Sequence, residues 1–151
     1  DAVTFEQVDL YEVACKCADT LRVNARKHDV SFALQGEPVM IRANREMVIE
    51  LVNNLCDNAI RYNEKNGWVA VTVKKDGDKG VLVVEDNGIG IPKDHQDRIF
   101  ERFYRVDKSR SKQTGGTGLG LAIVKHIVML HDASLELVSD EGKGTRITVA
   151  F

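Results

Sequence analysis

Apolar residues recur along this chain with two different periods, and the change of period predicts where helices and strands lie. Apolar residues spaced three and four apart predict helices over residues 9–27 and 45–63, with Asp9 and Asn44 placed to cap their N-termini. Alternation of apolar and polar residues predicts strands over 30–34, 39–42, 68–74, 80–85, 134–138 and 145–151. The run at 81–84 is almost entirely apolar, which favours a central strand.

Turn residues indicate how these strands are connected. Gly36-Glu37-Pro38 predicts a hairpin between the first two strands, and Asp76-Gly77-Asp78 predicts another between the third and the fourth. The last two strands are joined by Asp140-Glu141-Gly142-Lys143-Gly144. The strands are therefore expected to pair mostly with their neighbours in the chain.

A long irregular segment separates the fourth strand from the rest. Residues 88–117 show no sustained period apart from a short helical piece at 94–103, and a segment this long is usually functional. A helix then begins at Thr117 or Gly118 and runs to about residue 130. The predicted fold class is α/β, a two-layer sandwich in which a mixed, mostly antiparallel sheet carries about three helices on one face.

Composition narrows the function classes. The 151 residues suit one domain, residues 1–151, which we expect to be a fragment of a larger chain. The net charge of −2 gives no general attraction to nucleic acid or to a membrane surface, and no apolar run reaches the ~18 residues of a membrane span. Cys15, Cys17 and Cys56 form no even disulfide set and have no usual zinc spacing. Reduced thiols are expected, which favours a cytoplasmic location.

The first candidate site lies on the second predicted helix. Glu50, Asn54 and Asn58 stand at i, i+4 and i+8, and Arg61 and Tyr62 follow one turn later, so these side chains share one helical edge. Amide oxygens are hard ligands that suit Mg²⁺, and the arginine can reach a phosphate. The alternative is a solvated helix face that carries a satisfied amide.

The second candidate site follows the central strand, at Asp86-Asn87-Gly88-Ile89-Gly90. A carboxylate at a strand end can accept the amino proton of adenine, whereas guanine offers a carbonyl at that place. Gly88 and Gly90 would let the backbone approach the base. The alternative is an ordinary turn, because Asp-Asn-Gly is common in turns.

The third candidate site is the glycine-rich segment Gly115-Gly116-Thr117-Gly118-Leu119-Gly120-Leu121. Free backbone N–H groups and the start of a helix suit a phosphate, although the spacing matches neither the P-loop nor the dinucleotide-binding fingerprint. Plain flexibility is the alternative. Basic residues that could steer a triphosphate precede the segment: Arg98, Arg102, Arg105, Lys108, Arg110 and Lys112.

Taken in order, these motifs resemble the catalytic and ATP-binding domain of bacterial two-component sensor histidine kinases, within the ATPase superfamily of gyrase and MutL. Residues 50–62 resemble the family's Asn box and residues 86–90 its first glycine box. Residues 100–103 resemble its Phe box and residues 116–120 its second glycine box. The resemblance covers nearly the whole chain, and it implies the Bergerat fold with an ATP lid.

The resemblance also implies roles for individual residues. Asn58 would coordinate Mg²⁺, with Asn54 beside the metal and the phosphates. Arg61 would contact a phosphate, Tyr62 would stack near adenine, and Asp86 would bind the adenine amino group.

Further residues would complete the nucleotide site by the same resemblance. Tyr104 and Arg105 would reach the ribose and the phosphates, and Thr145 would support the adenine site. The lid and the phosphate loop would be framed by Gly116, Thr117, Gly118, Leu119 and Gly120.

The implied activity is transfer of the γ-phosphoryl group of ATP to a histidine on a separate dimerisation domain, with a response regulator as an indirect partner. Relatives that hydrolyse ATP carry a Glu where this chain has Asn54, which favours transfer over hydrolysis. Catalytic roles are assigned to Asn54 and Arg61, with Glu50 as a fallback base. None of the four histidines lies in an acceptor motif, so the chain is not expected to phosphorylate itself alone. A serine kinase of the anti-sigma type and a non-catalytic ATP-binding or docking module remain alternatives.

Overall fold

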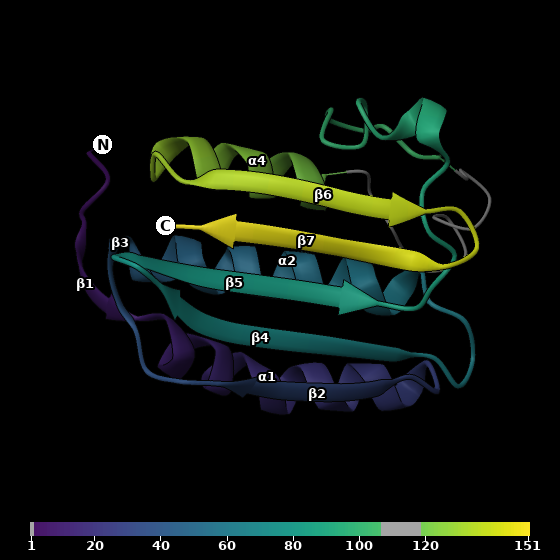
Figure 1. Cartoon of the computed structure of the whole chain (residues 1–151), viewed down its shortest axis with the longest axis horizontal. Helices are drawn as coiled ribbons and strands as arrows, with labels where there is room; N and C mark the ends of the chain where they lie inside the picture. The colour runs from purple at the N-terminus through teal and green to yellow at the C-terminus, as the bar shows by residue number, and fades with distance from the viewer. Residues whose placement is uncertain (1, 107–118) are drawn as a thin grey trace.

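A five-stranded sheet forms one layer and three α-helices form the other, in residues 2–106 and 119–151, which the computed structural model describes (Figure 1). The strand order is β2-β4-β5-β7-β6, with β2 and β4 parallel and the other neighbours antiparallel. The strands are β2 (Ser31–Gly36), β4 (Trp68–Asp76), β5 (Lys79–Asp86), β6 (Ser134–Asp140) and β7 (Gly144–Ala150). The predicted α/β sandwich is confirmed, and β5, which holds the apolar run, is central.

The helices cover one face of this sheet, behind it in Figure 1. They are α1 (Leu10–Lys27), α2 (Arg45–Arg61) and α4 (Gly120–Leu130), and α2 packs between the other two. Both predicted N-caps are confirmed, since the Asp9 carboxylate accepts from Tyr11 N at 3.1 Å and Asn44 Oδ1 accepts from Met47 N at 3.0 Å. These caps fix where the two helices begin.

The core lies between the two layers and follows the predicted periods. Leu51, Leu55 and Ile60 of α2 are fully buried, as are Val71 and Leu82 of the sheet. Their apolar side chains come from opposite layers and form one hydrophobic cluster. The three cysteines are free thiols, as predicted.

The predicted hairpin between residues 30–34 and 39–42 is wrong. The strand β2 pairs in parallel with β4, and β3 (Met40–Ala43) pairs with β1 (Glu6–Asp9), a strand that the sequence analysis did not identify. Gly36 ends β2 rather than starting a turn. A Cβ at this glycine would overlap the Val73 carbonyl oxygen of β4, so a larger residue would separate the two strands.

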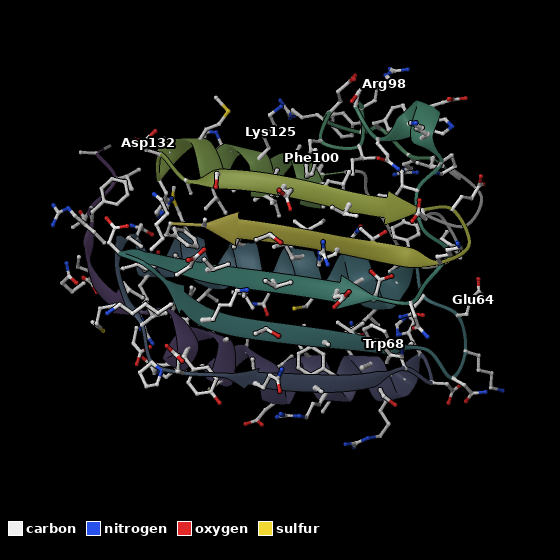
Figure 2. All side chains as sticks on the ribbon, viewed as in Figure 1. Glu64, Trp68, Arg98, Phe100, Lys125 and Asp132 are labelled. Carbon is white, nitrogen blue, oxygen red and sulfur yellow. The ribbon has the colours of Figure 1, made fainter. Side chains whose placement is uncertain are left out.

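The predicted helical piece at 94–103 is also largely wrong. Only the 3₁₀ helix η1 (Lys93–His95) forms, followed by turns closed by hydrogen bonds such as Arg98 N to His95 O at 3.0 Å. Phe103 has a positive φ of 65°, which no α-helix accommodates. In Figure 2, Arg98 marks this segment at the upper right, and Asp132 marks the far end of α4.

Within the described ranges, no helix combines the length and apolar character needed to cross a lipid bilayer.

Candidate functional site

A cavity of about 480 Å³ lies where α2, the end of β5 and the start of α4 meet the irregular segment after β5. The predicted site residues that line it are Asn54, Asn58, Arg61, Tyr62, Asp86, Gly90, Tyr104, Arg105, Leu119, Gly120 and Thr145. Residues of three separate motifs therefore share one cavity, together with Tyr104, Arg105 and Thr145, which only the family resemblance implied. Its size suits a small-molecule ligand.

The helix side of the cavity carries Asn54 and Asn58, one turn apart on α2. The first residue of α4 lies close to Asn54, since a Cβ at Gly120 would stand 3.5 Å from Asn54 Oδ1. Leu119, the N-cap of α4, makes no side-chain cap hydrogen bond. The start of α4 thus lies close to the Asn54 amide of α2, and a helix N-terminus beside an amide oxygen suits a phosphate and its metal ion.

Arg61 is held in place by an acidic residue that the sequence analysis missed. Its Nη2 lies 2.8 Å from Asp57 Oδ2, and Asp57 Oδ1 in turn accepts from Asn24 Nδ2 at 3.0 Å. Asp57 also lines the cavity. Its i, i+4 spacing to Arg61 was the available signal. The ion pair orients the guanidinium and offsets part of its charge.

Asp86 supplies a half-buried carboxylate at the sheet side of the cavity. Burial raises its pKa to about 6, against backbone N–H groups of Gly88 and Thr145 that lower it. Gly88 N donates to Asp86 Oδ1 at 2.8 Å. At neutral pH the carboxylate is mainly ionised and accepts hydrogen bonds from whatever occupies the cavity.

The two glycines after Asp86 allow close backbone approaches. Gly90 has a positive φ of 69°, and a Cβ there would overlap the Asp140 carbonyl oxygen. A Cβ at Gly88 would lie 2.6 Å from Tyr62 O. Gly88 does not line the cavity itself, and its part is to hold Asp86. Glycine is required at both positions because a larger residue would displace the cavity wall.

The wall formed by the irregular segment is largely apolar, and it carries one aromatic and one basic side chain, Tyr104 and Arg105. Tyr104 OH hydrogen-bonds to His95 Nδ1, and the Arg98 guanidinium lies 4.5 Å from the centre of the Tyr104 ring. Arg105 Nε is buried with no hydrogen-bond partner among the described residues. An unsatisfied guanidinium nitrogen in a cavity wall can be satisfied by an acceptor on a ligand.

Some predicted site residues lie elsewhere. Glu50 is exposed and does not line the cavity, so its assignment as a fallback base stays an untested prediction. Gly116, Thr117 and Gly118 fall outside the described residues, as do the basic residues Lys108, Arg110 and Lys112.

Two further polar residues behind the cavity were also missed. Ser139 Oγ hydrogen-bonds to Thr145 Oγ1 at 2.8 Å, and Gln96 Nε2 donates to Ser139 O at 3.0 Å. Neither belongs to a motif that sequence analysis singled out. Their roles depend on strand register and on a tertiary contact, which no local pattern contains.

In the part of the chain that the structure describes, no group of three or more His, Cys, Asp or Glu side chains could hold a metal ion. Asn54 and Asn58 offer amide oxygens instead. This donor set fits Mg²⁺, which takes oxygen ligands and is usually completed by water and substrate phosphates.

Residues 43–151 match the family described as histidine kinase-, DNA gyrase B- and HSP90-like ATPase. The sensor-like histidine kinase SenX3 of Mycolicibacterium smegmatis is 37% identical over 147 residues, which are 97% of this chain and 38% of SenX3. The sensor histidine kinase YkoH of Bacillus subtilis is 37% identical over 99% of this chain and 32% of YkoH. The chain thus spans about a third of the length of these relatives.

Solved structures of histidine kinases have the same fold as this chain. A mycobacterial sensor histidine kinase, MprB, superposes with a TM-score of 0.83 at 30% identity, covering 98% of this chain and 97% of MprB. Full-length ShkA in complex with AMPPNP superposes with a TM-score of 0.84 at 25% identity, covering 99% of this chain and 31% of ShkA.

Proposed function

This chain belongs to the family of histidine kinase-, DNA gyrase B- and HSP90-like ATPases, and from that premise we propose that it binds ATP with Mg²⁺ for phosphoryl transfer. The γ-phosphoryl group goes to a histidine on a separate dimerisation domain of the same kinase, in two-component signalling. The histidine kinases to which the chain is similar support this function, and ShkA, solved with AMPPNP, supports the nucleotide.

The observation that carries the proposal is the position of Asp86 in the same cavity as Asn54 and Asn58. The Asp86 carboxylate accepts from Gly88 N, and its remaining lone pairs can accept a hydrogen bond from the amino group of adenine. The amides of α2 and the start of α4 supply groups for phosphates at another wall. One cavity thus offers both a base end and a phosphate end.

At the phosphate end, Asn58 is assigned to Mg²⁺ and Asn54 to the metal and the phosphates. When bound, Mg²⁺ neutralises charge on the transferring phosphoryl group. Arg61, oriented by Asp57, and Arg105, with its unsatisfied Nε, are the cations that the described residues contribute to the cavity wall. Their part is to bind and orient the phosphates.

Asn54 favours transfer over hydrolysis. An amide cannot take a proton from water, whereas a neutral imidazole is already a nucleophile and needs no general base to attack. Glu50 is exposed and outside the cavity, so positioning and charge neutralisation carry the proposed reaction. The dimerisation domain is the direct protein partner, the response regulator an indirect one, and a cytoplasmic location would supply the ATP.

Calorimetric titration of the 151-residue chain with ADP and ATP, with and without Mg²⁺ and with GTP as the control, tests the nucleotide part. Adenine-selective binding that Mg²⁺ strengthens for ATP is expected. Absence of binding to a folded sample would contradict the proposal and favour the docking-module alternative.

Transfer is tested by adding a dimerisation domain from a similar kinase together with radiolabelled ATP. Label that enters the added domain and is stable to base but not to acid identifies a phosphohistidine. Label on serine would instead favour the serine-kinase alternative.

A further inference from the structure

We propose that Ser139 is a positioning residue that fixes the hydroxyl of Thr145 as a hydrogen-bond acceptor toward the base, so that the cavity selects a purine with an amino group at position 6, as in adenine. This inference rests on the proposed function, because it concerns how the same cavity recognises adenine.

The three residues concerned form a row across the sheet. Thr145 of β7 is the register partner of Asp86 in β5 on one side and of Ser139 in β6 on the other. In the next inward-facing row, Val84, Ile147 and Leu137 are all apolar. The inner face of the sheet thus changes from apolar to polar at the row that borders the cavity.

A count of protons at Ser139 fixes the direction of its hydrogen bonds. A serine hydroxyl has one proton and two lone pairs. Ser139 Oγ lies 3.0 Å from the carbonyl oxygen of Gly144, which can only accept, and 2.9 Å from the N–H of Ile91, which can only donate. The proton of Ser139 therefore goes to Gly144 O. The contact of 2.8 Å between Ser139 Oγ and Thr145 Oγ1 must then use the proton of Thr145.

As a consequence, the hydroxyl proton of Thr145 points toward Ser139 and away from the cavity. The lone pairs of Thr145 Oγ1 are what remain for a ligand, and Thr145 lines the cavity beside Asp86. Two neighbouring acceptors attract the amino group of adenine, which has two N–H bonds. They oppose a purine with a carbonyl at that position, because acceptor then faces acceptor.

Ser139 is itself held from outside the cavity. Gln96 Nε2 donates to Ile91 O at 2.9 Å and to Ser139 O at 3.0 Å. Together with Ile91 N to Ser139 Oγ, these bonds tie the chain after the glycine turn to β6. Rotation of the serine proton toward Thr145 would leave the contact of 3.0 Å between Ser139 Oγ and Gly144 O without a proton, so that two oxygen acceptors would face each other.

The test compares ADP with inosine diphosphate, which carries a carbonyl in place of the amino group. Both nucleotides are titrated calorimetrically into the 151-residue chain and into Ser139→Ala. The variant frees the proton of Thr145, so its preference for ADP over inosine diphosphate is expected to fall by about fivefold, the worth of one neutral hydrogen bond. Part of the preference remains, because Asp86 is unchanged.

Two control variants separate positioning from general structure. Ser139→Thr keeps a hydroxyl and is expected to show the wild-type preference for ADP over inosine diphosphate. Ser134→Ala removes a hydroxyl from an exposed position of the same strand and is expected to leave it unchanged. If Ser139→Ala does not fold, Thr145→Val serves instead, since it removes the second acceptor and should reduce the preference in the same way.

The outcomes are distinct. An unchanged preference in folded Ser139→Ala, or in Thr145→Val, would overturn this inference while the wild-type chain still binds ADP. A wild-type chain that binds no nucleotide would overturn the proposed function and this inference together.

Discussion

Replacement of Asp86 by Asn separates the cost of the carboxylate to folding from its use in binding. Asparagine has nearly the same shape, and its Oδ1 can still accept from Gly88 N, which lies 2.8 Å from Asp86 Oδ1. What changes is the charge and the second polar atom, which becomes a donor. The expected result is a more stable domain at neutral pH that has lost most of its affinity for adenine nucleotides.

The magnitude follows from the pKa of Asp86, which burial raises from 3.8 to about 6 in the folded protein. Between these values the folded state binds more protons than the unfolded state, so the free energy of unfolding falls as pH rises through this window. A difference of about 2 in pKa corresponds to about 3 kcal/mol lost by pH 7.5. Weaker hydrogen bonds from Gly88 and Thr145 to the neutral amide offset about 1 kcal/mol of the gain. Asp86→Asn should therefore raise the free energy of unfolding by about 2 kcal/mol at pH 7.5 and leave it little changed or lower near pH 4.

The assay is urea unfolding of both proteins at pH 4, 5, 6 and 7.5, paired with ADP titration at pH 7.5. Because the difference between the two proteins is compared across pH, contributions of other titrating groups largely cancel. ADP affinity should fall more than tenfold, since the new amide donor faces the donor on adenine. A variant that is equally destabilised at every pH would refute the argument that burial of the charge is costly. Unchanged ADP affinity would remove Asp86 from the base site.

Three further predictions concern other parts of the molecule. Asn58→Ala should abolish the gain in ATP affinity on adding Mg²⁺ and leave ADP binding without Mg²⁺ unchanged; calorimetry with a gain equal to wild type would contradict the metal assignment. In urea unfolding, Gly90→Ala should lower the free energy of unfolding by more than about 2 kcal/mol, because a Cβ there overlaps Asp140 O. The control is Gly77→Ala, where φ is similar but nothing lies within 4 Å of the new Cβ, and it should lower the free energy of unfolding by about 1 kcal/mol. Leu51→Ala should cost about 2–5 kcal/mol in urea unfolding because the side chain is fully buried, whereas Met129→Ala, 70% exposed, should stay within about 0.5 kcal/mol.

The sequence was sufficient for features that depend on local period and local chemistry. The sequence predicted the caps at Asp9 and Asn44 from residue type and position, and the buried faces of α1 and α2 from spacing. It predicted the central place of β5 from the apolar run at 81–84. The motifs on α2 and after β5 share one cavity, as the resemblance implied. These features can be predicted from sequence because a helix cap or an alternating strand is determined by residues a few positions apart.

The sequence analysis did not predict which strands and side chains pair when they lie far apart in the chain. Residues 30–42 read as a hairpin because two short strands flank Gly36-Glu37-Pro38, yet β2 pairs with β4 more than thirty residues later. Only the close approach of Gly36 to Val73 shows why the glycine belongs in the strand. Gln96 was missed for the same reason, since its contact with Ser139 O spans 43 residues. Ser139 was missed because its contact with Thr145 depends on the register of β6 and β7.

The two ends of the cavity belong to different layers, and the core between the layers determines how each end is aimed. Asn54 and Asn58 face the cavity because Leu51 and Leu55, on the neighbouring stripe of α2, are buried against the sheet. A slip of one residue would rotate each side chain by about 100° and bury an amide in the core. The same slip in β5 would turn Asp86 to the uncovered face of the sheet. The apolar periods that build the fold therefore also hold the proposed base end and phosphate end in register. Core packing aims the two layers at the cavity, and polar contacts such as Asp57 with Arg61 then fix individual side chains.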